Sequence, residues 1–185
     1  MNLTDALPLL PASDRDFAQS LLNAQNKYGS LTAKQAYWVE KLIARATRPA
    51  AQQVGDLSKV VGMFNTAATN LKRPNVRFAN GESEFIVSRA ADTSANPGCL
   101  YVKREGEYLG KVTPSGEFRS SRDADTTGVL EALQAFAAAP EAVAKAYGQK
   151  FGCCCFCSRE LTDDRSIRAG YGPVCAGNYG LAWGE

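Results

Sequence analysis

The chain has 185 residues, of which 45% are apolar and 22% charged, a composition typical of a folded globular protein rather than a disordered one. No apolar run approaches the roughly 20 residues that a membrane span needs, and the first residues lack the basic segment of a secretory signal. We therefore expect a protein of the reducing cytoplasm, where persistent disulfides are uncommon. The net charge of +2 is too small to indicate a polyanionic partner by itself, and the absence of histidine removes the commonest general base.

The first predicted element is a helical hairpin over residues 14–46, which we assign to a first domain of residues 1–46. Apolar residues of its first helix recur at helical spacing, namely at Phe17, Leu21, Ala24 and Tyr28. Thr32 and Gln35 form a capping box that predicts the start of the second helix. The stretch 47–56 has no periodicity and is predicted to be a linker.

A helix-flanked antiparallel sheet is predicted for residues 57–150. An amphipathic helix begins this segment and ends at Pro74. Five short runs of strand composition follow, separated by turn signals: VRFA, EFIVSRA, CLYVKRE, EYLGKVT and EFRSS. Such short spacers favour an antiparallel meander over parallel βαβ units. Residues 127–148 return to helix with a break at Pro140, so the chain is predicted to have an α+β fold.

Five of the six cysteines lie between residues 151 and 175. Cys154 and Cys157 form a C-x-x-C pair, which can bind one tetrahedral zinc through two thiolates at about 2.3 Å. Cys175 follows in the run GYGPVC as a third ligand, where the glycines suit a turn and Pro173 suits the first turn of a short helix. We therefore predict a structural zinc in a treble-clef-like module over residues 151–185.

The fourth zinc ligand stays open between Cys153, Cys155, Asp163 and water. Cys153 is the first choice, because Cys155 is needed to form the knuckle between the other two ligands. A redox dithiol, an iron–sulfur cluster and unliganded core cysteines are the alternative interpretations. Cys99 lies far from the cluster and is predicted to be a buried thiol. With no histidine and no evident general base, a catalytic zinc is not expected, and neither is an enzyme.

A longer pattern surrounds these cysteines. It runs C-x-x-C, one residue, R-x-L-T-D-x-x-S and then G-x-G-P-x-C, at Cys154, Cys157, Arg159, Leu161, Thr162, Asp163, Ser166, Gly170, Gly172, Pro173 and Cys175. In this the segment resembles a small zinc-binding module of unknown function that is frequent in bacteriophage and mobile-element proteins. That module has glycine or asparagine where this chain has Ser158, which weakens the preference for positive φ without removing a ligand. The resemblance implies a zinc and a phage protein in the bacterial cytoplasm, and it implies no activity.

Two polar residues of this pattern also have a purely structural interpretation. Asp163 and Ser166 are predicted to cap the turn or the helix start that follows them, and Arg159 to pair with Asp163 or Asp164. A direct contact of these side chains with a ligand is the alternative.

Basic and aromatic residues cluster in the middle of the chain. Tyr101 and Lys103 fall on one face of their strand, and Tyr108, Lys111 and Phe118 extend that surface across the hairpin. Sheets with exposed aromatic and basic residues hold single strands by stacking and phosphate contacts. The candidate nucleic-acid-binding residues are Arg73, Arg77, Tyr101, Lys103, Tyr108, Lys111 and Arg119. The alternative is an ordinary half-buried sheet with a solvated charged face.

Two functions fit these features. The first is a phage accessory protein that binds nucleic acid, single-stranded DNA above all, through the sheet, with a structural zinc. The second is a protein-binding module that docks on a host enzyme and inhibits or redirects it. Neither requires a membrane or a small-molecule substrate.

Overall fold

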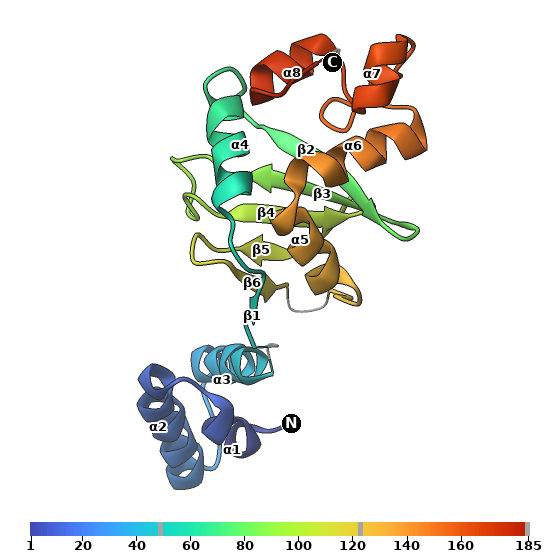
Figure 1. Ribbon diagram of the computed structural model, residues 1–185. Helices are drawn as coiled ribbons and strands as arrows, with labels where there is room; N and C mark the ends of the chain where they lie inside the picture. The colour runs from blue at the N-terminus through green and yellow to red at the C-terminus, as the bar shows by residue number, and fades with distance from the viewer. Residues whose placement is uncertain (48–49, 122–123, 184–185) are drawn as a thin grey trace. The chain divides into compact units, whose positions relative to one another are not determined.

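The computed structural model describes residues 1–47, 50–121 and 124–183 (Figure 1). The chain divides into two compact units, Met1–Ala50 and Ala51–Glu185. No helix of the described ranges is both long and apolar enough to cross a bilayer.

The N-terminal unit is helical, with the predicted hairpin as its largest part. Its elements are α1 (Leu3–Ala6), a 3₁₀ turn η1 (Leu7–Leu9), α2 (Ala12–Tyr28) and α3 (Ala33–Ala46). The predicted capping box is present, since the Gln35 amide donates to Thr32 Oγ1 and the Thr32 amide donates to Gln35 Oε1. The two short elements that precede the hairpin were not predicted.

The core of this unit differs from the predicted stripe. Leu3, Leu10, Ala18, Leu21 and Leu42 are buried. Phe17 and Tyr28, which share the helical spacing of Leu21, are exposed instead. The reason is that Leu3 and Leu7 of α1 and η1 also pack against the hairpin. Fewer apolar residues of α2 are therefore buried than its helical spacing predicted.

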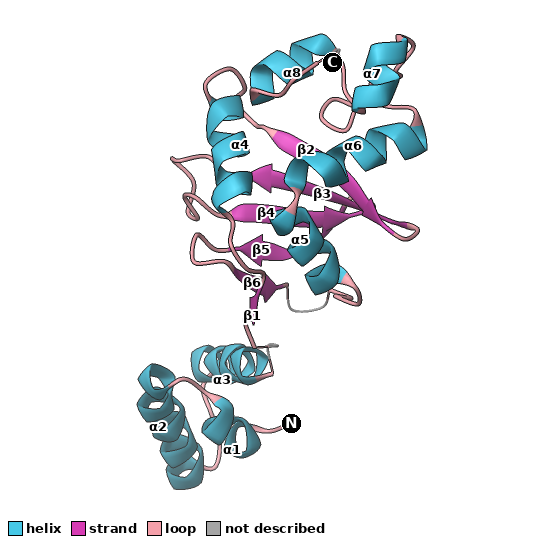
Figure 2. Cartoon of the chain, viewed as in Figure 1, coloured by secondary structure: helices cyan, strands magenta, loops and turns pink. Residues whose placement is uncertain are grey.

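The second unit is built on one antiparallel sheet of six strands in the order β1-β6-β5-β4-β3-β2 (Figure 2). The strands are β1 (Gln52–Gln53), β2 (Asn75–Asn80), β3 (Ser83–Arg89), β4 (Leu100–Arg104), β5 (Glu107–Val112) and β6 (Glu117–Ser120). The last five are the five predicted strands, joined as a meander. The two-residue β1 lies in the stretch 47–56 predicted as a linker, of which residues 48–49 fall outside the described residues.

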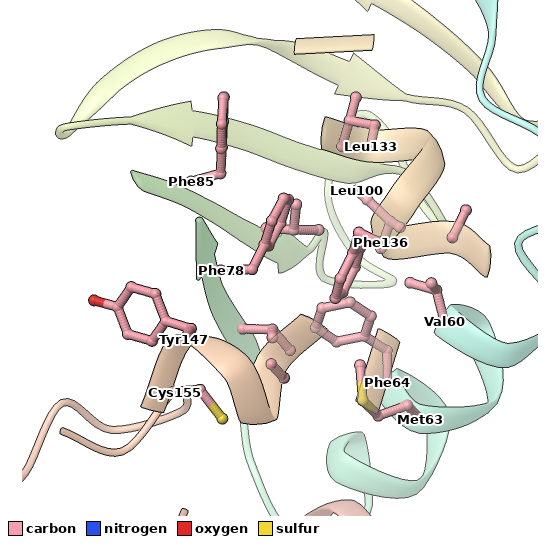
Figure 3. Packing of buried hydrophobic residues seen from close by; sticks show 14 of the residues in the cluster. Val60, Met63, Phe64, Phe78, Phe85, Leu100, Leu133, Phe136, Tyr147 and Cys155 are labelled. Carbon is pink, nitrogen blue, oxygen red and sulfur yellow. The ribbon is translucent and has the colours of Figure 1, made fainter. Parts of the chain in front are cut away.

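Three helices cover one face of this sheet: α4 (Ser58–Ala68), α5 (Val129–Ala138) and α6 (Pro140–Phe151) (Figure 1). Alternate strand residues such as Val76, Phe78 and Val102 are fully buried against them. Phe78 stacks on Phe136 of α5 with ring centroids 4.6 Å apart (Figure 3). The break predicted at Pro140 separates α5 from α6, because proline takes the first position of the second helix.

The cysteine segment ends in two short helices, α7 (Asp164–Ala169) and α8 (Pro173–Tyr179), and packs along the edge strand β2. The Arg77 amide of β2 donates to the Cys155 carbonyl oxygen at 2.7 Å. The Tyr179 hydroxyl accepts from the Asn75 amide at 2.8 Å and donates to the Asn75 carbonyl at 2.6 Å. The sheet and the cysteine module, predicted as the separate domains 57–150 and 151–185, thus belong to one compact unit.

Candidate metal centre and open sheet face

The C-x-x-C pair lies on a tight turn. Cys154 donates its amide to the Arg159 carbonyl at 2.8 Å, and its own carbonyl accepts from the Ser158 amide at 2.8 Å. Ser158 has a φ of 60°, one of two positive values among the described residues other than glycine. This is the position where the resembling module has glycine or asparagine, and the serine adopts the same left-handed conformation at a steric cost. The predicted knuckle is therefore formed.

The third cysteine reaches the knuckle through the turn between α7 and α8. Gly170 ends α7 with a φ of 79° and Pro173 occupies the first turn of α8, so that Cys175 follows near the helix start. The sulfur atoms of Cys154, Cys157 and Cys175 all lie within 4.8 Å of one another. Two sulfur ligands of a tetrahedral zinc are about 3.8 Å apart when each Zn–S bond is about 2.3 Å, so these three cysteines could hold a metal ion.

Two thiols of the trio have pKa values that are shifted by their contacts. The hydrogen bonds with the Cys155 and Cys175 thiols lower the pKa of Cys154. The hydrogen bond to Cys154 and burial raise the pKa of Cys175. Cysteine binds a metal as thiolate, so the affinity of the trio for a metal should fall as the pH is lowered.

None of the protein ligands proposed for the fourth position joins this group in the described part of the chain. Cys153, the first choice, lies apart with its thiol beside the Tyr147 hydroxyl, whose pKa is raised by burial and by Cys153 and Glu84. Cys155 is fully buried and belongs to the main core (Figure 3). Cys99, as predicted, is a buried thiol outside the group.

Asp163 has the structural role that its position predicted. Its carboxylate accepts the amides of Arg165 at 3.0 Å and of Ser166 at 3.3 Å, which caps the start of α7. It also forms an ion pair with the Arg165 side chain at 3.3 Å. Asp163 thus pairs with Arg165 and not with its predicted partner Arg159.

Aromatic side chains that the sequence did not single out pack around the cysteines. Phe156, inside the C-x-x-C pair, stacks on Tyr179 with ring centroids 3.8 Å apart and contacts Tyr171. Trp183 donates its indole N–H to the buried Ser166 Oγ at 3.2 Å, and the Arg165 guanidinium lies over its ring. Phe156, Tyr171 and Tyr179 are buried in the same core as the sheet, so the main core extends up to the cysteines.

The second candidate site is the sheet face opposite the three helices. In one row across the strands, Arg77, Ile86, Lys103 and Tyr108 are paired in register. In the next row the paired residues are Ser88, Tyr101, Lys111 and Arg119. All eight side chains are partly or fully exposed, whereas strand neighbours such as Val76, Val87 and Val102 are buried under the helices. Six of the seven candidate nucleic-acid-binding residues therefore share one face, called here the open sheet face, and Arg73 lies in the turn before β2.

A β-bulge places Tyr108 on this face. Tyr108 and Lys111 are three residues apart, which in a regular strand would put them on opposite faces. The pairing shifts at Val102 and Lys103, so that the extra residue Leu109 enters the core. Gly110 makes the bulge possible with a φ of 152° and a close approach to the Arg119 carbonyl, where a Cβ would lie only 2.3 Å from the oxygen.

Polar contacts orient part of the open sheet face. The Tyr101 and Tyr108 rings meet edge to face with centroids 6.0 Å apart. Asn96 donates to the Tyr101 hydroxyl at 3.2 Å and accepts a hydrogen bond from Lys111. Arg119 forms an ion pair with Glu117 at 2.8 Å.

One residue expected on this surface is buried on the other side of the sheet. Phe118 is only 2% exposed and packs in the core under the helices. It pairs with Val112 on β5, another core residue, whereas its neighbour Arg119 pairs with Lys111 on the open face. The expectation for Phe118 was therefore wrong, because the bulge shifts the alternation between Tyr108 and the end of β5.

The comparisons with known proteins concern the cysteine module alone. The model of a family of unknown function (DUF6011) matches residues 144–180, about a fifth of the chain. The matched stretch begins within the first half of α6, ends one residue after α8 and contains all three clustered cysteines. No curated protein and no solved structure gives a significant match.

Proposed function

We propose that this protein binds single-stranded nucleic acid, DNA above all, on the open sheet face. The observation that carries the proposal is the register of the sheet. It gathers two tyrosines and four basic residues on the one face that the helices leave uncovered, namely Arg77, Tyr101, Lys103, Tyr108, Lys111 and Arg119.

The chemistry of this face suits an unpaired strand. Aromatic rings offer stacking surfaces to bases of any sequence, while lysine and arginine neutralise the phosphates between them. Tyr101 and Tyr108 come from neighbouring strands, which lie about 4.8 Å apart, so two successive bases could use the pair. Tyr108 is 41% exposed, and Lys103 makes no hydrogen bond or ion pair within the described residues. Lys103 can therefore contact a phosphate without breaking an existing interaction.

The metal in this proposal is a structural zinc held by Cys154, Cys157 and Cys175 in a treble-clef-like module. The three donors are soft thiolates, two from the knuckle and one from the short helix α8. Thiolate ligands favour zinc over hard cations such as Mg²⁺ and Ca²⁺. The buried aromatic side chains packed around the cysteines and the contacts with β2 support a role in folding rather than in chemistry. As in the resembling module, the setting we propose is an accessory protein of a bacteriophage, in the cytoplasm of its host.

Binding should be measured by fluorescence anisotropy of a labelled oligo-dT across a salt series, with the full-length zinc-loaded chain. Charge reversal of Lys103 and Lys111 should weaken binding and reduce the salt slope by about 1.4, since each phosphate contact to a single strand contributes about 0.7. Tyr101→Ala should cost about 1–3 kcal/mol, or roughly 5- to 150-fold in affinity, with little change in slope. Charge reversal of Lys34, exposed on α3, serves as the matched control.

Two results of these measurements would exclude the proposal. No binding of single- or double-stranded DNA or RNA by the wild-type protein at about 50 mM salt, where electrostatic binding is favoured, excludes it. An affinity that is unchanged in both lysine and tyrosine variants excludes the open sheet face as the site. Either result would favour the second candidate, docking on a host protein.

A further inference from the structure

A pocket of about 630 Å³ lies where the cysteine module meets the edge strand β2. Ligand pockets usually measure about 300–1,000 Å³, so it has the size for a nucleotide. Its polar lining includes three arginines: Arg73 before β2, Arg77 within β2 and Arg159 from the knuckle. The three clustered cysteines, Cys154, Cys157 and Cys175, line the same pocket. Leu71 and Val174 contribute apolar walls, and Val174 is 75% exposed.

The three arginines have few partners within the protein. The guanidinium of Arg77 donates to Asn75 Oδ1 at 3.4 Å, a long hydrogen bond. The side chains of Arg73 and Arg159 have no hydrogen-bond or ion-pair partner anywhere in the described ranges. Of the two carboxylates in the lining, Asp163 already caps α7 and pairs with Arg165, which leaves the exposed Glu160.

From this arrangement we propose that the pocket binds a phosphate monoester. A guanidinium presents a planar set of donors that matches two phosphate oxygens at once, and a terminal phosphate offers more charge and more free oxygens than a phosphodiester. The apolar walls suit the sugar or base that carries the phosphate. A free nucleoside monophosphate and the end of a nucleic-acid strand share this chemistry.

Of these two ligands, the end of a nucleic-acid strand fits the arrangement of the sheet better. This inference rests on the proposed function. Arg77 lines the pocket and is also the first residue of the row that continues through Ile86 and Lys103 to Tyr108. That row spans three strand spacings, or about 14 Å, so a strand lying along it would end at the pocket. The protein would then distinguish a phosphorylated end from the interior of a strand.

A structural role for the arginines makes a different prediction. If Arg73 and Arg159 only neutralise the nearby thiolates, replacing them should reduce zinc retention and leave ligand preference unchanged. If they bind phosphate, zinc content should stay at the wild-type level. Zinc content of each purified variant therefore has to be measured together with binding.

The experiment compares oligo-dT with a free hydroxyl, a 5′-phosphate or a 3′-phosphate at its end, and includes thymidine monophosphate and inorganic phosphate as separate ligands. The zinc-loaded full-length protein should bind one phosphorylated oligonucleotide at least 10-fold more tightly than the unphosphorylated one. Arg73→Gln with Arg159→Gln should abolish that preference, so that phosphorylated and unphosphorylated oligonucleotides bind the variant with the same affinity. Arg168→Gln, on an exposed side chain of α7 outside the pocket lining, is the matched control.

The outcomes separate this proposal from the proposed function. Equal binding of all three oligonucleotides, or loss of zinc in the double arginine variant, overturns the phosphate pocket and leaves the open sheet face untouched. If no oligonucleotide binds but thymidine monophosphate does, and the double variant loses it, the proposed function fails and the phosphate pocket stands.

Discussion

The cysteine module depends on a close approach of two glycines, and this gives the sharpest test of how it is held. Gly148 lies in α6 and Gly170 at the end of α7, two helices that are neighbours in Figure 1. A Cβ at Gly148 would lie 2.1 Å from the Gly170 carbonyl oxygen and 2.4 Å from its Cα. A Cβ at Gly170 would in turn lie 2.4 Å from the Lys145 carbonyl oxygen. Both contacts are with backbone atoms, which cannot rotate away as a flexible side chain can.

Gly148→Ala has two opposing effects on the free energy of unfolding. An alanine in a helix interior stabilises by about 1 kcal/mol relative to glycine. Overpacking costs typically about 1–3 kcal/mol, and the backbone contact places this site at the upper end. The net expectation is a loss of about 2 kcal/mol in the free energy of unfolding. At roughly 4 °C per kcal/mol for a domain of this size, the melting temperature should fall by about 8 °C.

Gly62→Ala is the matched control, because it makes the same chemical change in a helix interior. Gly62 lies exposed in α4, and a Cβ there has no neighbour within 4 Å. This variant should therefore gain about 0.5–1 kcal/mol. Circular dichroism during thermal and denaturant unfolding measures both variants.

A zinc measurement connects the packing to the metal site. The Gly170 carbonyl accepts a hydrogen bond from the Cys155 amide at 3.2 Å, so a displaced Gly170 should disturb the knuckle. In competition with a chelator, Gly148→Ala should release zinc more readily than Gly62→Ala. A Gly148→Ala protein as stable as the wild type, or equal losses in both variants, would refute this account of the packing.

Two further predictions concern the metal and pH. Cys154→Ser and Cys175→Ser should each abolish zinc binding and unfold the module, because binding free energy in such sites is largely folding free energy. Elemental analysis measures the zinc content, and the control Cys99→Ser should keep its zinc. Hydrogen bonds from the Thr127 amide and side chain lower the pKa of Asp125 to about 2. Asp125→Ala should therefore melt below the wild type at neutral pH, and the difference should vanish as the pH falls from about 4 to 2, where the carboxylate becomes protonated.

Much of the fold could be predicted because its elements are specified locally. Alternation and turn residues predicted the strands β2 to β6, and Thr32 with Gln35 predicted the start of α3. The two residues of β1 carry no pattern of their own, since they form a strand only by pairing with β6. Spacing alone was also sufficient to single out Cys154, Cys157 and Cys175.

The remaining features depend on side-chain direction and on contacts between distant segments. Whether Cys153 or Cys155 faces the metal ligands is decided by the course of the knuckle, which spacing does not specify. Tyr108 reached the open face only through the bulge at Gly110, although a glycine inside a strand is a recognised bulge signal. The pocket could not be predicted, because Arg77 and Arg159 meet only where β2 pairs with the knuckle.

The contact between the module and β2 also indicates what a metal held by the three cysteines would contribute to the proposed function. β2 is an edge strand, and an uncovered edge is a site of unwanted strand pairing. The module covers it through the bond from Arg77 to Cys155 and through the two bonds between Tyr179 and Asn75. The central strands β4 and β5, which carry Tyr101, Lys103 and Tyr108, pair with each other and with β3 and β6 instead. If the cysteines hold zinc as proposed, a chelator should therefore disrupt the pocket beside β2 and the β2 edge before it disrupts the open sheet face.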